Sequence, residues 1–190
     1  HTPGLYQLEL VARSRKDTQV VLAWSHFVDS EPADILPLPP ASNEPVDPMQ
    51  AADALYAALN TLRSSAGARP VARFEPFEPL VREHAAYMAA SGFLGHRISS
   101  VTEGVATRAS RRFHPRALHH EDLATAPTWE EALEITRLSP GHLANLLCDN
   151  CTHASIGVAI EPVTDRTPRI FVVWELLEFP QGPPVAIPVR

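Results

Sequence analysis

Residues 169–179 constrain the fold of this chain most, because they form a nearly continuous apolar run. As a strand, the run places apolar side chains on both faces: Ile170, Val172, Trp174 and Leu176 on one, and Phe171, Val173, Leu177 and Phe179 on the other. A strand that is apolar on both faces is buried on both. The run therefore predicts a sheet between two layers of helices. For Glu175, which lies among these residues, an ion pair with an arginine is favoured over a place in a polar site.

A second strand is predicted at residues 154–161, where apolar residues recur at every other position. Ala154, Ile156, Val158 and Ile160 share one face of it. Gly157 lies on the other face, which indicates that another group approaches the backbone closely there. A short extended segment is also predicted over residues 70–74.

The helices are predicted from apolar residues at helical spacing and from capping residues at their ends. The pattern predicts helices over residues 49–67, 78–91, 101–113 and 129–138, and a further helix from Ser139. Gly92 ends the second, and Thr128 caps the fourth. On the third helix, we expect Arg108, Arg111 and Arg112 to lie on a face that is exposed to solvent. The alternative is that they form an anion-binding site.

The chain divides into four segments. Residues 1–30 alternate as a β-hairpin with strands at 5–13 and 19–28, which has to pack on the main domain, on a partner or on an upstream β-domain. Residues 31–48 hold six prolines and predict an extended linker. The main domain spans 49–180, and 181–190 is a tail.

Composition excludes some classes of function. The net charge is −6, so the chain lacks the positive electrostatic potential that is typical of a nucleic-acid-binding protein. Hydrophobic residues make up 45% of the chain, as in ordinary globular proteins. No apolar run approaches the length of a membrane-spanning helix.

The segment from Ser139 to His142 predicts a helix start with a histidine in its first turn. The Ser139 hydroxyl suits the N-cap, and Pro140 suits the first helical position. The positive end of the helix dipole disfavours imidazolium at His142, and a neutral imidazole is what metal ligation requires. The alternative is a histidine that satisfies nearby backbone groups.

Cys148 and Cys151 are the two cysteines of the chain. Redox-active cysteines of a C-x-x-C pair need the N-terminal end of a helix, whereas Cys148 follows a helix. A structural disulfide is therefore favoured, which implies an oxidising compartment. A zinc site completed by histidines is the alternative.

Four segments together resemble a known family. They are 54–63, with Asn60 and Arg63; 84–96, which ends in a Phe-x-x-His turn; 121–124, which reads Glu-Asp-Leu-Ala; and 139–160, with its Ser-Pro-Gly-His helix and Ile-Gly-Val strand. In this order they resemble the bacterial branch of the CAP superfamily, the SCP-like extracellular domains. The resemblance spans residues 49–180.

The resemblance implies a three-layer α-β-α sandwich, a secreted or cell-surface location, and a cleft formed by His96, Glu121 and His142. The chain departs from the family pattern in several places. Asp122 replaces an asparagine, Leu143 an arginine and Thr136 a tryptophan. The family's second glutamate has no clear match; Glu134 and Glu175 are weak candidates.

The favoured function is a non-enzymatic binding module for a small molecule, a lipid or a cell-surface protein. No cofactor is required, but His96 and His142 can bind a divalent metal such as zinc. Glu121 is then either a further ligand or a residue that contacts a ligand from the second shell. The alternatives are a metal-dependent hydrolase and a structural module of a longer surface protein. His119 and His120, expected in the loop after the third helix, lie near enough in sequence to join the site, and His84 is expected in the core or the cleft lining.

Overall fold

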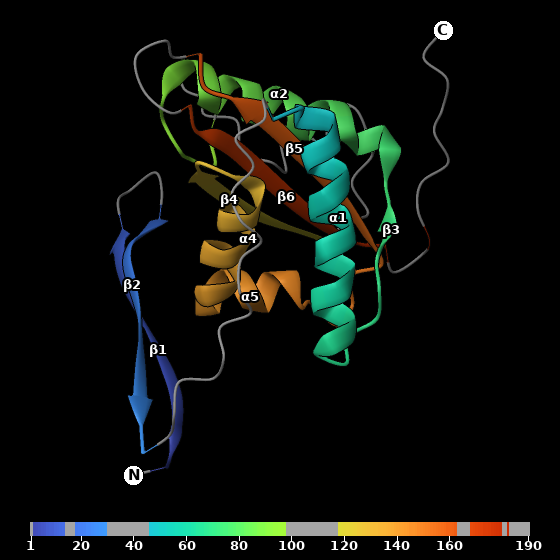
Figure 1. Cartoon of the computed structure of the whole chain (residues 1–190). Coiled ribbons are helices and arrows are strands. Elements are labelled where there is room, and N and C mark those ends of the chain that lie inside the picture. Colours follow the sequence, from blue (N-terminus) through green and yellow to red (C-terminus); the bar gives the residue numbers. More distant parts are fainter. Residues whose placement is uncertain are drawn as a thin grey trace, which may run out of the picture.

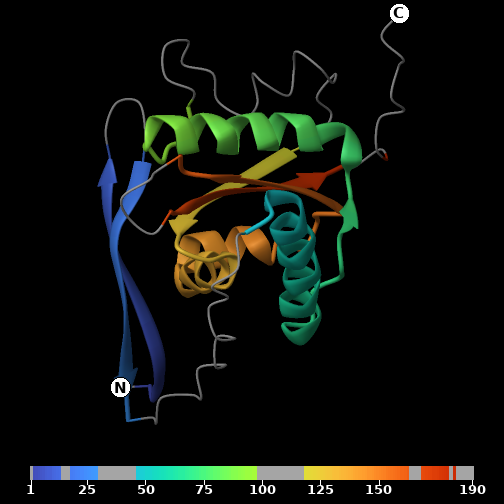
Figure 2. The same ribbon diagram turned by 45° about the horizontal axis from the view of Figure 1, so that its top comes forward.

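The computed structural model describes residues 2–13, 18–29, 46–97, 118–162, 168–179 and 182. Within these, a four-stranded sheet has the order β3-β5-β6-β4. Helix α2 covers one face, and helices α1, α4 and α5 cover the other (Figures 1 and 2). The predicted three-layer sandwich is confirmed. None of the described helices is both long and apolar enough to cross a lipid bilayer.

The elements follow the chain in a simple order. The helices are α1 (Pro48–Ser65), a 3-10 turn (Glu75–Phe77), α2 (Glu78–Ser91), α4 (Trp129–Leu138) and α5 (Pro140–Leu146). The strands of the sheet are β3 (Ala72–Arg73), β4 (Leu118–Ala126), β5 (His153–Ile160) and β6 (Ile170–Glu178). Strand β6 pairs antiparallel with β4 and β5, and β3 pairs parallel with β5.

Strand β6 is buried on both faces, as predicted. Phe171 and Trp174, which point to opposite faces, are both fully buried. Trp174 belongs to the core beneath α1, α4 and α5, whereas Phe171 belongs to the core beneath α2. The sheet thus separates two hydrophobic cores, each closed by its own helical layer.

The close approach predicted at Gly157 is confirmed. A Cβ at this position would overlap the backbone of Val81 in α2. The missing side chain therefore lets α2 lie directly on β5. The helix-capping predictions are confirmed as well: Thr128 accepts a hydrogen bond at the start of α4, and Gly92 ends α2 in the left-handed conformation at φ 66°.

One expectation is wrong. The sequence predicts a loop at His119 and His120, but both residues lie in β4, which pairs with β6 over its whole length. The first half of β4 carries polar side chains in place of an alternation of apolar ones. These polar side chains can lie in a strand because they have partners on neighbouring elements. The predicted helix 101–113 with its arginines, His114, most of the linker and most of the tail lie outside the described residues.

The predicted hairpin is confirmed as β1 (Gly4–Arg13) and β2 (Thr18–Val28), paired antiparallel. It stands beside the domain, where β1 contacts α5 and β2 contacts α4 (Figure 2). Tyr6, Leu8, Leu10 and Val11 on β1 remain exposed. Glu9, between two of them, is half-buried, which places it on the side of the strand that meets the domain.

Candidate functional site: a histidine and carboxylate cleft

A cleft of about 610 Å³ lies along the outer edge of β4. The segment after α2 and the first turn of α5 form its sides, and strand β1 contributes to its wall. Its polar lining residues are Glu9, His96, Glu121, Asp122, His142 and Asn145. Its apolar lining comes from Val11, Phe93, Leu94 and Leu123. The volume is within the range of small-ligand sites.

Glu121 lies between two histidines on the α2 side of the sheet. Its Oε2 is 3.2 Å from Nδ1 of His84, and its Oε1 is 2.9 Å from Nδ1 of His96. The side chains of His84 and Glu121 are almost fully buried, whereas that of His96 is 38% exposed. Glu121 therefore links a buried histidine to one at the cleft surface.

The contacts of His84 fix the position of one proton. Its Nε2 is 2.8 Å from the carbonyl oxygen of Gly95, which can only accept, so Nε2 carries a hydrogen. The contact between Nδ1 and Glu121 also needs a hydrogen. His84 is thus held between Gly95 and Glu121, directly behind the cleft.

His96 presents its second ring nitrogen as a potential ligand. When Nδ1 donates to Glu121, the lone pair of a neutral imidazole lies on Nε2. A carboxylate behind a histidine fixes the tautomer and raises the basicity of the metal-binding nitrogen. Glu121 thus has the position of an orienting group, with each oxygen in contact with a histidine.

Asp122 points to the opposite face of the sheet from Glu121. Its Oδ1 accepts from Nδ2 of Asn145 at 2.8 Å, while Oδ2 is buried and has no hydrogen-bond donor among the described residues. Burial raises the pKa of this carboxyl to about 7, against the opposing effect of the Asn145 hydrogen bond. The cleft therefore contains a buried carboxyl that is partly protonated near neutral pH.

His142 lies in the first turn of α5, where the sequence predicts it. The Ser139 hydroxyl accepts from its backbone N–H at 3.4 Å and caps the helix. Burial lowers the pKa of His142, and nearby His96 lowers it further, whereas the carboxylate of Glu9 raises it. His142 therefore favours the neutral form that a metal or a hydrogen-bond donor requires.

Glu9 is a cleft residue that sequence reasoning missed. The hydroxyl of Ser139 donates to its Oε1. Its Oε2 is 3.7 Å from the position that a Cβ on Gly141 would take. No local sequence signal reveals this contact, because Glu9 belongs to a hairpin that is far from α5 in the chain.

The three predicted site residues, His96, Glu121 and His142, all line this cleft. Among the described residues, however, the group with three potential ligand atoms within 4.8 Å of one another is His120, Cys148 and Cys151. His96, Glu121 and His142 are therefore more widely spaced than the ligands of a bound ion. Their role in metal binding stays a prediction.

The remaining candidates lie in different places. Glu134 pairs with Arg137 on α4, its Oε1 2.7 Å from Nη2, and does not line the cleft. Glu175 is fully buried on β6, directly opposite Glu121 in the strand register. The side chain of His119 is outside the described part of the structure.

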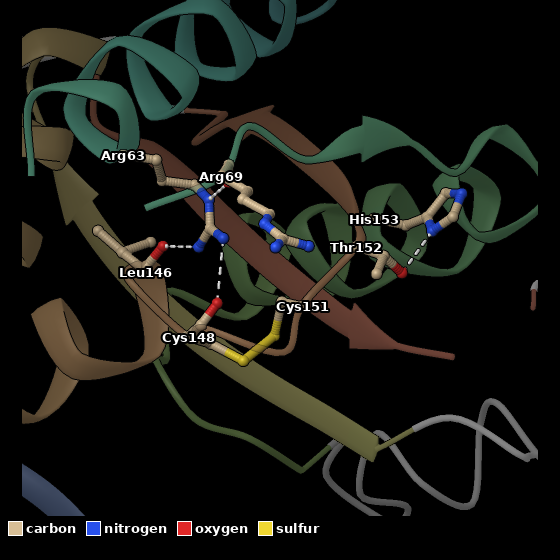
Figure 3. The surroundings of a disulfide bond; sticks show 7 residues. All are labelled: Arg63, Arg69, Leu146, Cys148, Cys151, Thr152 and His153. Atoms are coloured by element: carbon tan, nitrogen blue, oxygen red, sulfur yellow. Dashed lines mark hydrogen bonds between the residues drawn. A yellow bond between two sulfur atoms is a disulfide. The ribbon is translucent and has the colours of Figure 1, made fainter. Parts of the chain in front are cut away.

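Cys148 and Cys151 form the predicted disulfide, with their Cα atoms 5.4 Å apart (Figure 3). The two sulfurs are thereby occupied, so the group they form with His120 could hold a metal only after reduction. Arg63, which is fully buried, donates from Nη1 to the carbonyl of Leu146 at 2.6 Å and from Nη2 to that of Cys148 at 3.0 Å (Figure 3). It thus joins α1 to the end of α5 and to the disulfide.

Comparison with solved structures places this arrangement among known folds. An extracellular protein of Bacillus anthracis that contains an SCP domain superposes with a TM-score of 0.57 over 72% of this chain, at 18% sequence identity. The chain has the fold of an SCP domain. It spans 45% of the length of the Bacillus protein.

Two further bacterial proteins share this similarity. An outer surface protein of Borrelia burgdorferi matches 68% of this chain and 95% of its own length, with a TM-score of 0.57 and 18% identity. A cysteine-rich secretory protein of Staphylococcus aureus matches 70% of this chain and 41% of its own, at a TM-score of 0.46 and 14% identity. No protein-family profile and no curated protein matches the chain in sequence.

Proposed function

We propose that this SCP-like domain is a non-enzymatic, extracytoplasmic binding module whose cleft binds a divalent metal such as zinc through His96 and His142. The observation that carries the proposal is the contact of 2.9 Å between Nδ1 of His96 and Glu121. It sets the tautomer in which Nε2 can ligate, and His142 lines the same cleft.

The donor set fits such an ion in its chemistry. Imidazole nitrogens and carboxylate oxygens are the ligands that zinc takes beside thiolates. Burial lowers the pKa of His142 and so favours its neutral, ligating form. Glu121 contacts a histidine through each oxygen, which favours the orienting role over direct ligation.

An extracytoplasmic location is supported by two observations. The Cys148–Cys151 disulfide is typical of oxidising compartments. The solved structures with this fold include an extracellular protein and an outer surface protein. A bound ion would give the module a Lewis-acidic point at which the anionic group of a small ligand or a partner protein could bind.

Calorimetric titration with zinc chloride tests the metal site. We expect wild-type protein to bind one ion, and both His96→Ala and His142→Ala to weaken binding at least tenfold. His26→Ala, which removes an exposed histidine of the hairpin, is the matched control and should bind like wild type.

His120→Ala separates the two groups of potential ligands in the molecule. If the cleft holds the ion, this variant binds normally. Loss of binding in His120→Ala together with normal binding in His142→Ala would place the ion beside the cysteines and contradict the proposal. A panel of peptide and ester substrates with zinc present distinguishes the module from a metal-dependent hydrolase, since the proposal expects no turnover.

A further inference from the structure

We propose that Cys148, Cys151 and His120 form a metal site apart from the cleft, which opens when the disulfide is reduced and binds zinc through two thiolates and one imidazole. Among the described residues, these three offer ligand atoms that all lie within 4.8 Å of one another. The inference goes beyond the proposed function, because none of the three residues lines the cleft of His96 and His142.

The three side chains meet on one side of the sheet. His120 lies on β4, directly opposite Leu176 of β6 in the strand register. Residues that lie opposite each other in an antiparallel pair point to the same face, and Leu176 belongs to the core beneath α1, α4 and α5. Cys148 and Cys151, in the turn between α5 and β5, pack on the same core. The site is thus built on a paired strand and on a turn that is anchored in the core.

The turn that carries the cysteines is held by hydrogen bonds as well as by the disulfide. The carbonyl of Cys148 accepts from the backbone N–H of Cys151 at 3.3 Å and from Nη2 of Arg63 at 3.0 Å (Figure 3). The backbone N–H of Cys148 donates to the carbonyl of Asn145 at 3.0 Å. The stabilisation that a disulfide gives through chain entropy grows with the length of the loop, and this loop is short. We therefore expect the two cysteines to keep their positions after reduction.

A dithiol reductant opens the site in a balanced step. Cys148 is half-buried whereas Cys151 is 3% exposed, so a thiolate of the dithiol reaches Cys148 more easily. Its attack forms a mixed disulfide and releases Cys151, and the second thiolate of the dithiol then releases Cys148. The dithiol becomes a disulfide, and its two electrons and two protons convert the cysteines into thiols. Zinc replaces these two protons, because thiolates are the ligating form.

The set of donor atoms fits zinc. Two thiolates and one imidazole are ligands that proteins use for this ion, with its fourth position left to water or to another ligand. The C-x-x-C spacing is also typical of zinc sites. Soft thiolates disfavour calcium and magnesium, which prefer oxygen. Two thiolates neutralise the charge of the ion, so the buried guanidinium of Arg63 lies near a site without net positive charge.

Cobalt(II) tests this site on the full chain, because it takes the place of zinc and gives a charge-transfer absorption band when thiolates bind it. The chain has two cysteines, so such a band reports on this site alone. The protein is reduced with dithiothreitol, which is removed by gel filtration under argon. We expect the reduced protein to show the band and to bind one more equivalent of zinc in calorimetry than the oxidised protein.

Variants then assign the ligands. His120→Ala should weaken the binding of cobalt to the reduced protein at least tenfold, and Cys151→Ser should abolish the thiolate band. His26→Ala removes an exposed histidine of the hairpin and is the matched control, which should behave like wild type. An unchanged cobalt affinity in His120→Ala would overturn the assignment of the imidazole as a ligand.

The outcomes keep this proposal apart from the proposed function. If the reduced protein shows no thiolate band and binds no more zinc than the oxidised protein, the cysteine site is overturned, whatever the cleft binds. Circular dichroism of the reduced, metal-free protein is measured alongside. An unfolded reduced state would also overturn the proposal, which requires the turn to persist. Failure of the oxidised protein to bind zinc, with a thiolate band in the reduced protein, would overturn the cleft site alone.

Discussion

The hydroxyl of Ser139 donates to the carboxylate of Glu9, 130 residues earlier in the chain. The hydroxyl oxygen of Ser139 also accepts from the backbone N–H of His142 and thereby caps α5. A serine hydroxyl has one hydrogen to donate and lone pairs to accept with, so it can do both at once. One side chain thus joins the start of the histidine-bearing helix to the hairpin.

Replacing this hydroxyl should cost more than the loss of an ordinary helix cap. Loss of a serine or threonine N-cap costs about 1 kcal/mol, and Ser139→Ala also leaves Glu9 without its donor. We expect urea denaturation to show a larger loss of stability for Ser139→Ala than for Thr128→Ala, which removes only the cap of α4. The excess should vanish when both variants are compared in a Glu9→Ala background, which removes the acceptor. Equal losses in the wild-type background would contradict this contact.

The charge of Glu9 should be measurable at His142. The Glu9 carboxylate raises the pKa of His142 against the larger lowering that burial causes. Glu9→Gln removes the opposing effect, so the pKa of His142 should fall further. An NMR titration of the His142 ring without metal measures the change, and Glu130→Gln serves as the control. An unchanged pKa would show that the hairpin does not hold Glu9 beside His142 in solution.

Asp122→Asn should stabilise the protein in a pH-dependent way. Unfolded Asp122 ionises near 3.8, whereas burial in the folded protein raises its pKa to about 7. Because the folded pKa is raised, the favourable contribution is complete below pH 3.8 and is lost as the pH rises through about 7. A pKa change from 3.8 to about 7 corresponds to at most about 4 kcal/mol.

The advantage of Asp122→Asn over wild type should therefore grow between pH 4 and pH 7 and then level off. Free energies of unfolding, measured with urea at pH values across this range, test the prediction. Asparagine retains an oxygen that can accept from Asn145. A constant difference between Asp122→Asn and wild type would contradict the assignment.

Local patterns predicted the central sheet because burial leaves a direct trace in sequence. Three features could be read from short stretches of sequence: the doubly apolar run of β6, the glycine at 157 and the Ser-Pro start of α5. Each depends on the type of residue needed at that position and not on which distant element packs there. Strand β4 left no such trace. Its polar residues are compatible with a strand only because His84 and Asn145, from other elements, supply hydrogen-bond partners.

The candidate site divides in the same way. The motif resemblance identified His96, Glu121 and His142, and the structure places all three in the lining of one cleft. Glu9 could not be found by motif, because its place depends on how a separate hairpin docks. The same holds for the contact between His84 and Glu121, which arises when α2 packs over the edge strand.

Gly157→Ala should be the most destabilising single-methyl change among the positions discussed. A methyl group there would overlap the backbone of Val81, and neither a strand in the sheet centre nor a packed helix can move cheaply. We expect a loss of about 3 kcal/mol or more, as for overpacked cores. Gly141→Ala is the matched control, because a methyl there would meet Glu9 at 3.7 Å, an ordinary contact distance. Thermal unfolding of both variants tests the packing of α2 on β5; equal melting temperatures would contradict it.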